Sequence, residues 1–262
     1  EDFMQSRTFH SRSGWQWLLG LFATAAVALV VTTALRKDAP VPAAADQPAP
    51  QAAPDADVAI PPAADSDSRI REVLSALSPS QVFQRWLQED ELLDRLVVST
   101  VNIAEDASPT RSLSFLRPSR RFTATRSGTG MVMSAGSAAR YDVFVKVVSS
   151  LDDRQVASAY RTLHPLLESA YHALGYPGRP LDEVVTRALQ RIVDAPIRDQ
   201  VAVRRSGRLW VFADPRLESA GAVEKQFLRM GSRNTRLLQE EARSIAGALG
   251  LRLHGGLQAA TR

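Results

Sequence analysis

The strongest pattern of hydrophobic and polar positions is an uninterrupted apolar run near the start of the chain. From Trp15 to Leu35, 21 residues carry no charge. A helix of that length spans roughly 30 Å, which is the thickness of the hydrocarbon core of a bilayer. Trp17 joins Trp15 at one edge, where interfacial aromatic residues gather, and Arg36 and Lys37 close the other edge. The run predicts a transmembrane helix at 15–35.

Two other interpretations of this run are weaker. A buried core helix normally carries a polar stripe, but this run has only Gln16 and a few threonines. A cleaved signal peptide has a shorter apolar region, and the cleavage-like Ala43–Ala45 lies well beyond the run. We therefore favour an uncleaved anchor that binds the lipid bilayer.

A proline- and alanine-rich stretch follows the anchor. Ala39–Ala64 holds seven prolines and eleven alanines in 26 residues, with no Lys or Arg. Such a composition cannot bury a core, so 36–65 is predicted to be a disordered, extended linker that reaches roughly 80 Å. The basic residues on the two sides of the anchor balance, so its orientation depends on this linker. The absence of Lys and Arg from Ala39–Ala64 favours a cytoplasmic tail at 1–14 and a periplasmic C-terminal domain in a bacterial inner membrane.

Beyond the linker, apolar positions recur at helical spacing. They predict a compact multi-helix domain at 66–251, followed by a flexible tail at 252–262. Capping residues mark several helix starts, such as Ser78 as an N-cap before Pro79. Pro165 lies inside one long pattern and should kink or divide that helix. The predicted helices cover residues 69–77, 92–104, 153–174, 181–195, 222–230 and 233–250, with further helices after Pro79, Ser137 and Pro215.

β-structure is predicted at two places. Val201–Arg205 and Arg208–Ala213 flank Ser206-Gly207 and form a β-hairpin. Residues 106–135 contain several prolines and glycines and are predicted to be a loop with one short strand near 121–126. The fold class is therefore mainly α: a single N-terminal transmembrane helix, a disordered Pro/Ala linker, and a compact multi-helix domain with one small β-hairpin.

Charge and cysteine content narrow the range of functions. The chain has 32 basic and 28 acidic residues, a net charge of +4, and no cysteine. The absence of cysteine excludes disulfides, thiolate catalysis, zinc–thiolate sites and iron–sulfur clusters. The arginines are scattered, with the densest pairs at Arg120-Arg121 and Arg204-Arg205. Nucleic-acid binding usually needs a basic stripe with interleaved aromatic residues, so no nucleic-acid partner is predicted.

Motifs for metal binding or catalysis are weak. His164, Glu168 and His172 share one helix face, but the first and last lie about 12 Å apart along the axis, too far to meet at one ion. A solvated polar face explains them better than a metal site completed by another helix. The glycine-rich Ser127–Gly130 lacks the lysine of a P-loop. We predict no catalytic residue, no metal and no cofactor.

Several stretches of the domain carry a family resemblance: Arg140–Asp142, Tyr160–Leu167, Ala170–Pro177, Phe212–Glu218 and Lys225–Gly231 with Asn234. On these stretches the domain resembles DUF3014, a bacterial family of unknown function, over roughly Asp67 to Leu249. The resemblance implies a membrane segment and a Pro/Ala-rich spacer at the N-terminus, but it brings no activity, cofactor or catalytic residue. Ser232 departs from the family pattern, which has proline there, and this difference should alter only the entry of the last helix.

Nine residues are candidates for an interaction site or a structural network. Asp214 precedes Pro215 and is expected to cap a helix, after which Glu218 is expected to pair with Arg229 or Arg216. Gly231 is expected to be a C-cap and Asn234 an N-cap, which leaves Arg229 free for a buried ion pair or an anionic ligand. The nine are Arg140, Tyr141, Asp142, Tyr160, Tyr171, Asp214, Glu218, Arg229 and Asn234.

The sequence favours a non-enzymatic role. Because catalytic motifs are missing and the tether is long, we expect a single-pass envelope protein whose periplasmic domain binds a protein or cell-wall partner. The alternative is an envelope hydrolase or small-ligand-binding domain with a site around Tyr160, Tyr171, Asp214 and Arg229. A deep pocket where those four side chains converge would favour the alternative, and a surface rimmed by Arg and Tyr would favour a partner interface.

Overall fold

The computed structural model describes residues 63–109 and 111–254. The predicted tail at 1–14, the anchor at 15–35, the linker as far as 62 and the tail beyond 254 lie outside the described residues. Within those residues, no helix is both long enough and apolar enough to cross a bilayer.

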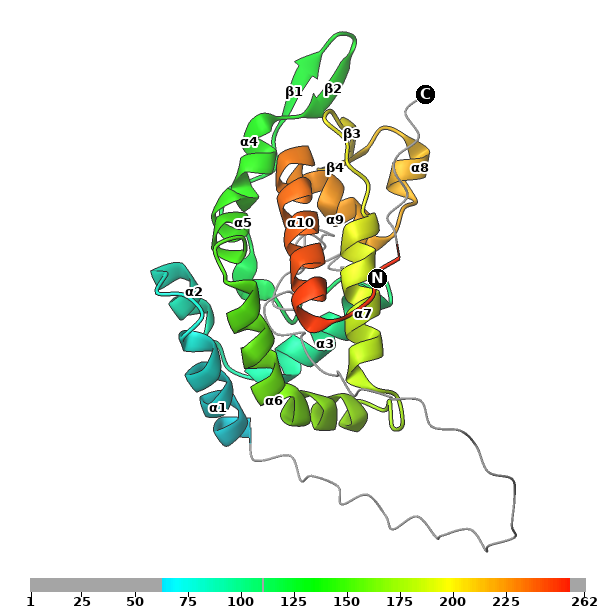
Figure 1. Ribbon diagram of the computed structural model, residues 1–262. Coiled ribbons are helices and arrows are strands. Elements are labelled where there is room, and N and C mark those ends of the chain that lie inside the picture. Colours follow the sequence, from blue (N-terminus) through cyan, green and yellow to red (C-terminus); the bar gives the residue numbers. More distant parts are fainter. Residues whose placement is uncertain (1–62, 110, 255–262) are drawn as a thin grey trace, which may run out of the picture.

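The described chain is mainly helical, as the periodicity predicts, and it also contains a small antiparallel sheet (Figure 1). The strands are β1 (Ala124–Ser127), β2 (Gly130–Met133), β3 (Ala202–Ser206) and β4 (Leu209–Phe212). The α-helices are α1 (Ala63–Ser75), α2 (Gln81–Trp86), α3 (Leu92–Ala104), α4 (Ala135–Ala138), α5 (Asp142–Val148), α6 (Asp153–Ala173), α7 (Leu181–Asp194), α8 (Pro215–Glu218), α9 (Ala222–Met230) and α10 (Ser232–Leu249). Two 3₁₀ turns, η1 (Ser114–Leu116) and η2 (Ala139–Tyr141), complete the set.

Four helices form the centre of the helical body. α10 packs against α6 and α7, α3 packs against the same two helices, and α1 covers α3 and α6. α7 shows why these helices pack: its apolar residues recur every three or four positions, and the polar face between them remains in water. The buried residues of α7 are Leu181, Val184, Val185, Ala188, Leu189, Ile192 and Val193.

Helix α6 follows its sequence signals closely. The Asp152 carboxylate accepts a hydrogen bond from the Gln155 backbone at 2.9 Å, as the capping pattern predicts. The helix is not divided at Pro165, and it changes direction along its course in Figure 1. A proline inside a helix removes one backbone hydrogen bond, which permits such a bend.

The sheet is larger than the sequence predicts. The expected loop at 106–135 holds two strands rather than one, because β1 overlaps the strand predicted near 121–126 and forms a hairpin with β2 that turns at Gly128-Thr129. The predicted hairpin of β3 and β4 is confirmed and turns at Gly207-Arg208, one residue later than expected. Gly128 and Gly207 both have φ of +57°, a backbone conformation that suits glycine in tight hairpin turns.

Strands β2 and β3 join the two hairpins into one sheet of order β1-β2-β3-β4. Met131 pairs with Val203 and Val132 with Ala202. Because β2 and β3 are antiparallel, both hairpin turns lie at the same end of the sheet. The β1–β2 hairpin projects beyond the helices in Figure 1.

A second, smaller core lies beneath the sheet. It consists of Val201, Val203, Phe212 and Leu228, and it is separate from the large core between the helices. Leu228 comes from α9, whose neighbouring residue Phe227 is buried in the large core. Helix α9 therefore connects the sheet to the helical body.

Two helix starts differ from the predictions. α1 begins at Ala63, before the predicted start at Arg69 and within the stretch assigned to the linker. Alanine has the highest helix propensity, and Asp65 in the first turn suits the helix dipole. α2 begins at Gln81 rather than Pro79, because the Ser78 hydroxyl accepts from the Ser80 backbone and forms a turn before the helix.

Candidate functional site

Asn234 holds the junction between α9 and α10 against the start of α5. Its predicted role as an N-cap is wrong, because it lies inside α10 and is buried. Its side-chain amide nitrogen donates to the carbonyls of Ala138 and Met230, both at 3.2 Å, and to the Asp142 carboxylate at 2.9 Å. The adjoining Gly231 has φ of +80°, and a Cβ there would lie 2.8 Å from the Cβ of Ala138.

Arg140 extends from this junction toward the sheet. Its Nε donates to the Ser137 carbonyl at 2.9 Å and its Nη1 donates to the Arg120 carbonyl at 3.1 Å. The guanidinium carbon lies 5.5 Å from the centre of the Phe122 ring. Among the described residues, the buried Nη2 has no hydrogen-bond partner. Arg140 therefore retains an unused donor beside an aromatic ring.

Arg229 approaches the same ring from α9. Its guanidinium carbon lies 5.5 Å from the centre of Phe122 and 4.8 Å from the centre of Phe212, and Nη2 donates to the Trp210 carbonyl at 3.3 Å. Burial lowers the pKa of Arg229, and the nearby charge of Arg140 lowers it further. An arginine starts from so high a pKa that this side chain remains charged at neutral pH.

We call this group of side chains the arginine–aromatic cluster; it consists of Arg140, Arg229, Phe122, Phe212 and Trp210. A guanidinium is attracted to the face of an aromatic ring, most strongly where water is excluded. Guanidinium groups bind anions, and aromatic rings bind flat π-surfaces. Neither kind of group transfers protons readily at neutral pH. The cluster therefore suits recognition better than catalysis.

The other predicted residues of this region border the cluster. Tyr141 is buried, which raises the pKa of its hydroxyl, and it forms a hydrogen bond with Gln226. Glu218 accepts from the Phe212 backbone at 2.8 Å rather than forming the expected ion pair, although its charge still raises the pKa of Arg229. Asp214 caps α8 as predicted, accepting from the Arg216 backbone at 2.8 Å.

Tyr160 belongs to a different cluster, between α6 and α7. Its hydroxyl donates to Asp182 Oδ1 at 3.0 Å, and His164 Nε2 lies 3.4 Å from the same oxygen. His164 Nδ1 lies 3.6 Å from Glu168. The predicted solvated face at His164 and Glu168 is thus a polar bridge that joins two helices. Among the described residues, no group of three metal-ligating side chains is placed to hold an ion.

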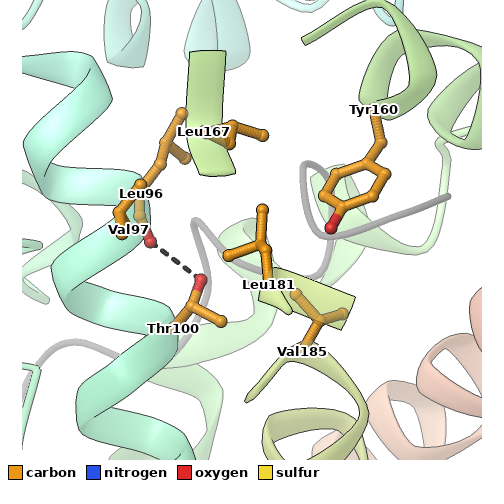
Figure 2. A pocket seen from close by; sticks show the side chains of 7 residues that line it. All are labelled: Leu96, Val97, Thr100, Tyr160, Leu167, Leu181 and Val185. Carbon is orange, nitrogen blue, oxygen red and sulfur yellow. Dashed lines mark hydrogen bonds between the residues drawn. The ribbon is translucent and has the colours of Figure 1, made fainter. Parts of the chain in front are cut away.

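A small cavity lies next to this bridge (Figure 2). It is about 10 Å³ in volume, close to the smallest space that accommodates one water molecule. Its lining is almost entirely apolar, and the Thr100 hydroxyl is already occupied by the Leu96 carbonyl at 2.8 Å. A substrate does not fit there.

The four residues of the alternative site are held by separate contacts. Tyr160 donates to Asp182, and Tyr171 stacks on Tyr176 with ring centres 4.9 Å apart. Asp214 caps α8, whereas Arg229 contacts Phe122, Phe212 and Trp210. The contacts of these four side chains do not point to one shared pocket.

The sequence reasoning missed a basic surface at the end of the sheet. We define the sheet tip as residues 126–132 and 204–211, which contain both hairpin turns. Its four arginines are all exposed, and none forms an ion pair with an acidic group of the described residues; they are Arg126, Arg204, Arg205 and Arg208. Arg205 instead lies over Trp210, 4.4 Å from the ring centre.

A pattern in the sequence does mark this surface. No acidic residue occurs from 107 to 141 or from 200 to 213, although the two segments contain nine arginines. At the chain-wide frequency of 28 acidic residues in 262, about five would be expected in these 49 positions. The arginines look scattered along the chain, and pairing of β2 with β3 brings them together.

These features define the class of protein as a mainly helical domain with a small antiparallel sheet whose end is basic. The family profile of DUF3014, described as a protein of unknown function, matches residues 92–246, and the chain belongs to that family. The predicted resemblance is thereby confirmed. No curated protein and no solved structure matches the chain.

Proposed function

We propose that this protein is a non-enzymatic interaction module of the bacterial envelope. A single helix at 15–35 holds it in the inner membrane, and the linker presents its helical domain in the periplasm. The tether is supported by the charge-free run from Trp15 to Leu35 and by the absence of Lys and Arg from Ala39–Ala64. The observation that carries the proposal is the sheet tip, which is exposed, basic and free of acidic side chains.

The arginine–aromatic cluster supports this role because it fixes the sheet on the helical body. Arg229 reaches from α9 to the carbonyl of Trp210 in β4, and Arg140 connects η2 to the segment before β1. A binding surface on a rigid element loses less entropy when a partner binds. The sheet is therefore suited to present the tip in one orientation.

The alternative of an envelope hydrolase or small-ligand-binding domain receives less support. Tyr160, Tyr171, Asp214 and Arg229 each have contacts of their own, and the cavity beside Tyr160 is about 10 Å³. Typical ligand pockets have several hundred Å³. We therefore base the proposed function on the tip.

The experiment that tests the interaction site uses photo-crosslinking in membranes. A photoreactive phenylalanine analogue replaces Leu209 at the tip or, as a control, Ser158 on the exposed face of α6. Adducts are identified by mass whether they are proteins, lipids or glycans. We expect one dominant adduct class from position 209 and little from position 158. Equal labelling at both positions would exclude the tip as the interaction site.

A fusion experiment tests the membrane placement. Alkaline phosphatase fused to the C-terminus should be active if the domain is periplasmic, because the enzyme needs disulfides that form there. Deletion of 15–35 should release the protein from carbonate-washed membranes. An inactive phosphatase together with an active cytoplasmic reporter would reverse the proposed orientation.

A further inference from the structure

We propose that the sheet tip docks onto a bilayer rich in anionic phospholipids, so that the protein contacts its own membrane a second time. This inference rests on the proposed function, since it takes the tether at 15–35 as given. It goes further by naming the partner as the phosphate groups of a lipid surface.

The charge of the tip is the first argument. Arg126, Arg204, Arg205 and Arg208 are exposed and without ion pairs to acidic groups of the described residues. The nearest acidic residues along the chain, Asp199 and Asp214, stand beyond the other ends of β3 and β4. Each basic side chain near an anionic bilayer favours binding by about fivefold. Guanidinium groups also pair with phosphate oxygens in a two-pronged geometry.

Apolar side chains on the outer face of the sheet are the second argument. Val132 faces outward from β2, and Leu209 and Val211 face outward from β4. All three are partly exposed and pack against neither core, whereas Val203 and Phe212 on the opposite face are buried. By the same register Arg204 shares this outer face and Arg208 lies in the adjoining turn, whereas Arg126 and Arg205 lie on the other face. The end of the sheet thus combines apolar and cationic side chains, which suits the interface of an anionic membrane, where acyl chains and phosphates lie close together.

The length and position of the tether are the third argument. α1 begins at the end of the molecule away from the sheet (Figure 1), so the tip can reach the bilayer only if the tether passes the whole domain. A compact domain of about 190 residues has a radius of gyration of roughly 16 Å. The predicted linker extends to roughly 80 Å, which is long enough to allow this arrangement.

An acidic protein segment would satisfy the charge alone. Its acidic groups would leave the outward apolar side chains of Val132, Leu209 and Val211 without an apolar partner. The predicted anchor also keeps the tip at a high effective concentration near lipid, which compensates for the weak affinity of so small a surface. The bilayer is therefore the partner that the observations favour.

The test uses the full chain, reconstituted in vesicles. Because the chain has no cysteine, Thr129→Cys labels the tip and Ser158→Cys labels α6 at a single position each, with a polarity-sensitive fluorophore. Vesicles contain phosphatidylcholine alone or with increasing phosphatidylglycerol. Both leaflets have the same composition, so the direction of insertion does not matter. Flotation of the vesicles reports anchoring, and fluorophore emission reports docking.

We expect a blue shift from position 129 that grows with the phosphatidylglycerol fraction, is reversed by 0.5 M salt and is absent at position 158. Replacing Arg204, Arg205 and Arg208 by glutamine should lower the ratio of docked to undocked protein on the order of 100-fold. The matched control replaces Arg154, Arg161 and Arg243, which are exposed arginines of α6 and α10 without ion pairs to described acidic groups. It should retain most of the response.

The two proposals fail in different ways. Vesicles that float without the protein would overturn the anchor and hence the proposed function. Protein that floats but gives equal emission from position 129 in neutral and anionic vesicles would overturn lipid docking alone. An equal loss of response in the two triple variants would show that net charge, rather than the tip, drives docking, and would also overturn it.

Discussion

At the scale of single residues, Glu241 on α10 has a carboxyl group whose ionised form is unfavourable in the folded protein. Burial and, to a smaller extent, the carboxylate of Asp153 together raise its pKa from 4.5 to about 7. Its Oε1 is buried and has no hydrogen-bond partner among the described residues. The folded protein therefore holds a proton on Glu241 more tightly than the unfolded chain does, and the charged form destabilises the fold.

This charge gives a prediction for the pH dependence of stability. Because the folded-state pKa is raised, the free energy of unfolding should fall as the pH rises from 4.5 through about 7. Glu241→Gln should remove part of that decline and stabilise the protein at pH 8 by about 1 kcal/mol, with allowance for solvent screening. Urea denaturation at pH 5 and pH 8 measures it. Glu240→Gln, an exposed neighbour, should change little; an equal gain there would contradict the assignment.

His164 gives a second pH-dependent term. The contact with Asp182 raises its pKa, burial opposes this change, and the charge of Glu168 adds to the increase. The protonated form is thus favoured by folding. The contribution of protonated His164 to the free energy of unfolding is fully present below 6.5, the pKa in the unfolded chain. It is lost as the pH rises through the pKa in the folded protein.

We expect His164→Gln to flatten the stability profile above pH 6, with a loss below about 1 kcal/mol at pH 6 and a smaller loss at pH 8. Asp182→Asn should flatten the stability profile in the same way, since it removes the negative charge that faces His164. Thermal unfolding across this range measures both variants. A His164→Gln profile parallel to that of the unmodified chain would argue against the ion pairs.

At the scale of elements, the α9–α10 junction requires glycine. Gly231 has φ of +80° and ψ of 159°, a region that other residues avoid, and the Ala138 methyl group occupies the space of a Cβ. Gly231→Ala should destabilise the fold by about 3 kcal/mol. Gly247→Ala, in the open interior of α10, should stabilise it by about 0.5 to 1 kcal/mol.

Chemical denaturation of these two variants, together with Gly231→Ala in an Ala138→Gly background, separates the two causes. The double variant removes the clash and leaves the backbone strain, so it should recover only part of the loss. Full recovery would mean that crowding alone requires glycine at this junction.

Element boundaries illustrate how far local signals reach. Helices α3, α7 and α9 match their predictions to within one residue, because the periodicity of their apolar positions lies within the segment itself. The β1–β2 hairpin is missed, since its four-residue strands alternate only weakly and β2 is joined to the rest of the sheet by β3, about 70 positions away. Its turn at Gly128-Thr129 is a signal that the sequence does contain.

At the scale of the whole molecule, α9 couples the two cores. Phe227 is buried among the helices, while Leu228 is buried beneath the sheet with 1% of its surface exposed. Truncation of Leu228 should therefore weaken the attachment of the whole sheet.

We expect Leu228→Ala to lower the free energy of unfolding by about 2–5 kcal/mol, the range for large-to-small changes in a core. Because α9 links the cores, the described domain should still unfold in one transition. Far-UV circular dichroism and tryptophan fluorescence in urea should give coincident curves, since Trp86 packs against the large core and Trp210 against the small one. Separated transitions would mean that the sheet unfolds independently.

The candidate site shows the same division between local and distant information. The structure brings six of the predicted residues to one region, where the sheet meets the helices. They are Arg140, Tyr141, Asp142, Glu218, Arg229 and Asn234. Tyr160 and Tyr171 are placed elsewhere, on contacts with Asp182 and Tyr176. The roles of the nine residues in binding remain predictions.

The sequence by itself determined the apolar run at 15–35, the linker composition, most helices and the family, because each depends on periodicity, caps or composition within a short stretch. Only the tertiary structure decided which distant segments meet. Asp106 caps α9 by accepting from the Val223 backbone at 3.0 Å, across 117 positions, and pairing of β2 with β3 assembles the basic tip. Such contacts depend on how the packed helices bring distant parts of the chain together, and local patterns do not encode that geometry.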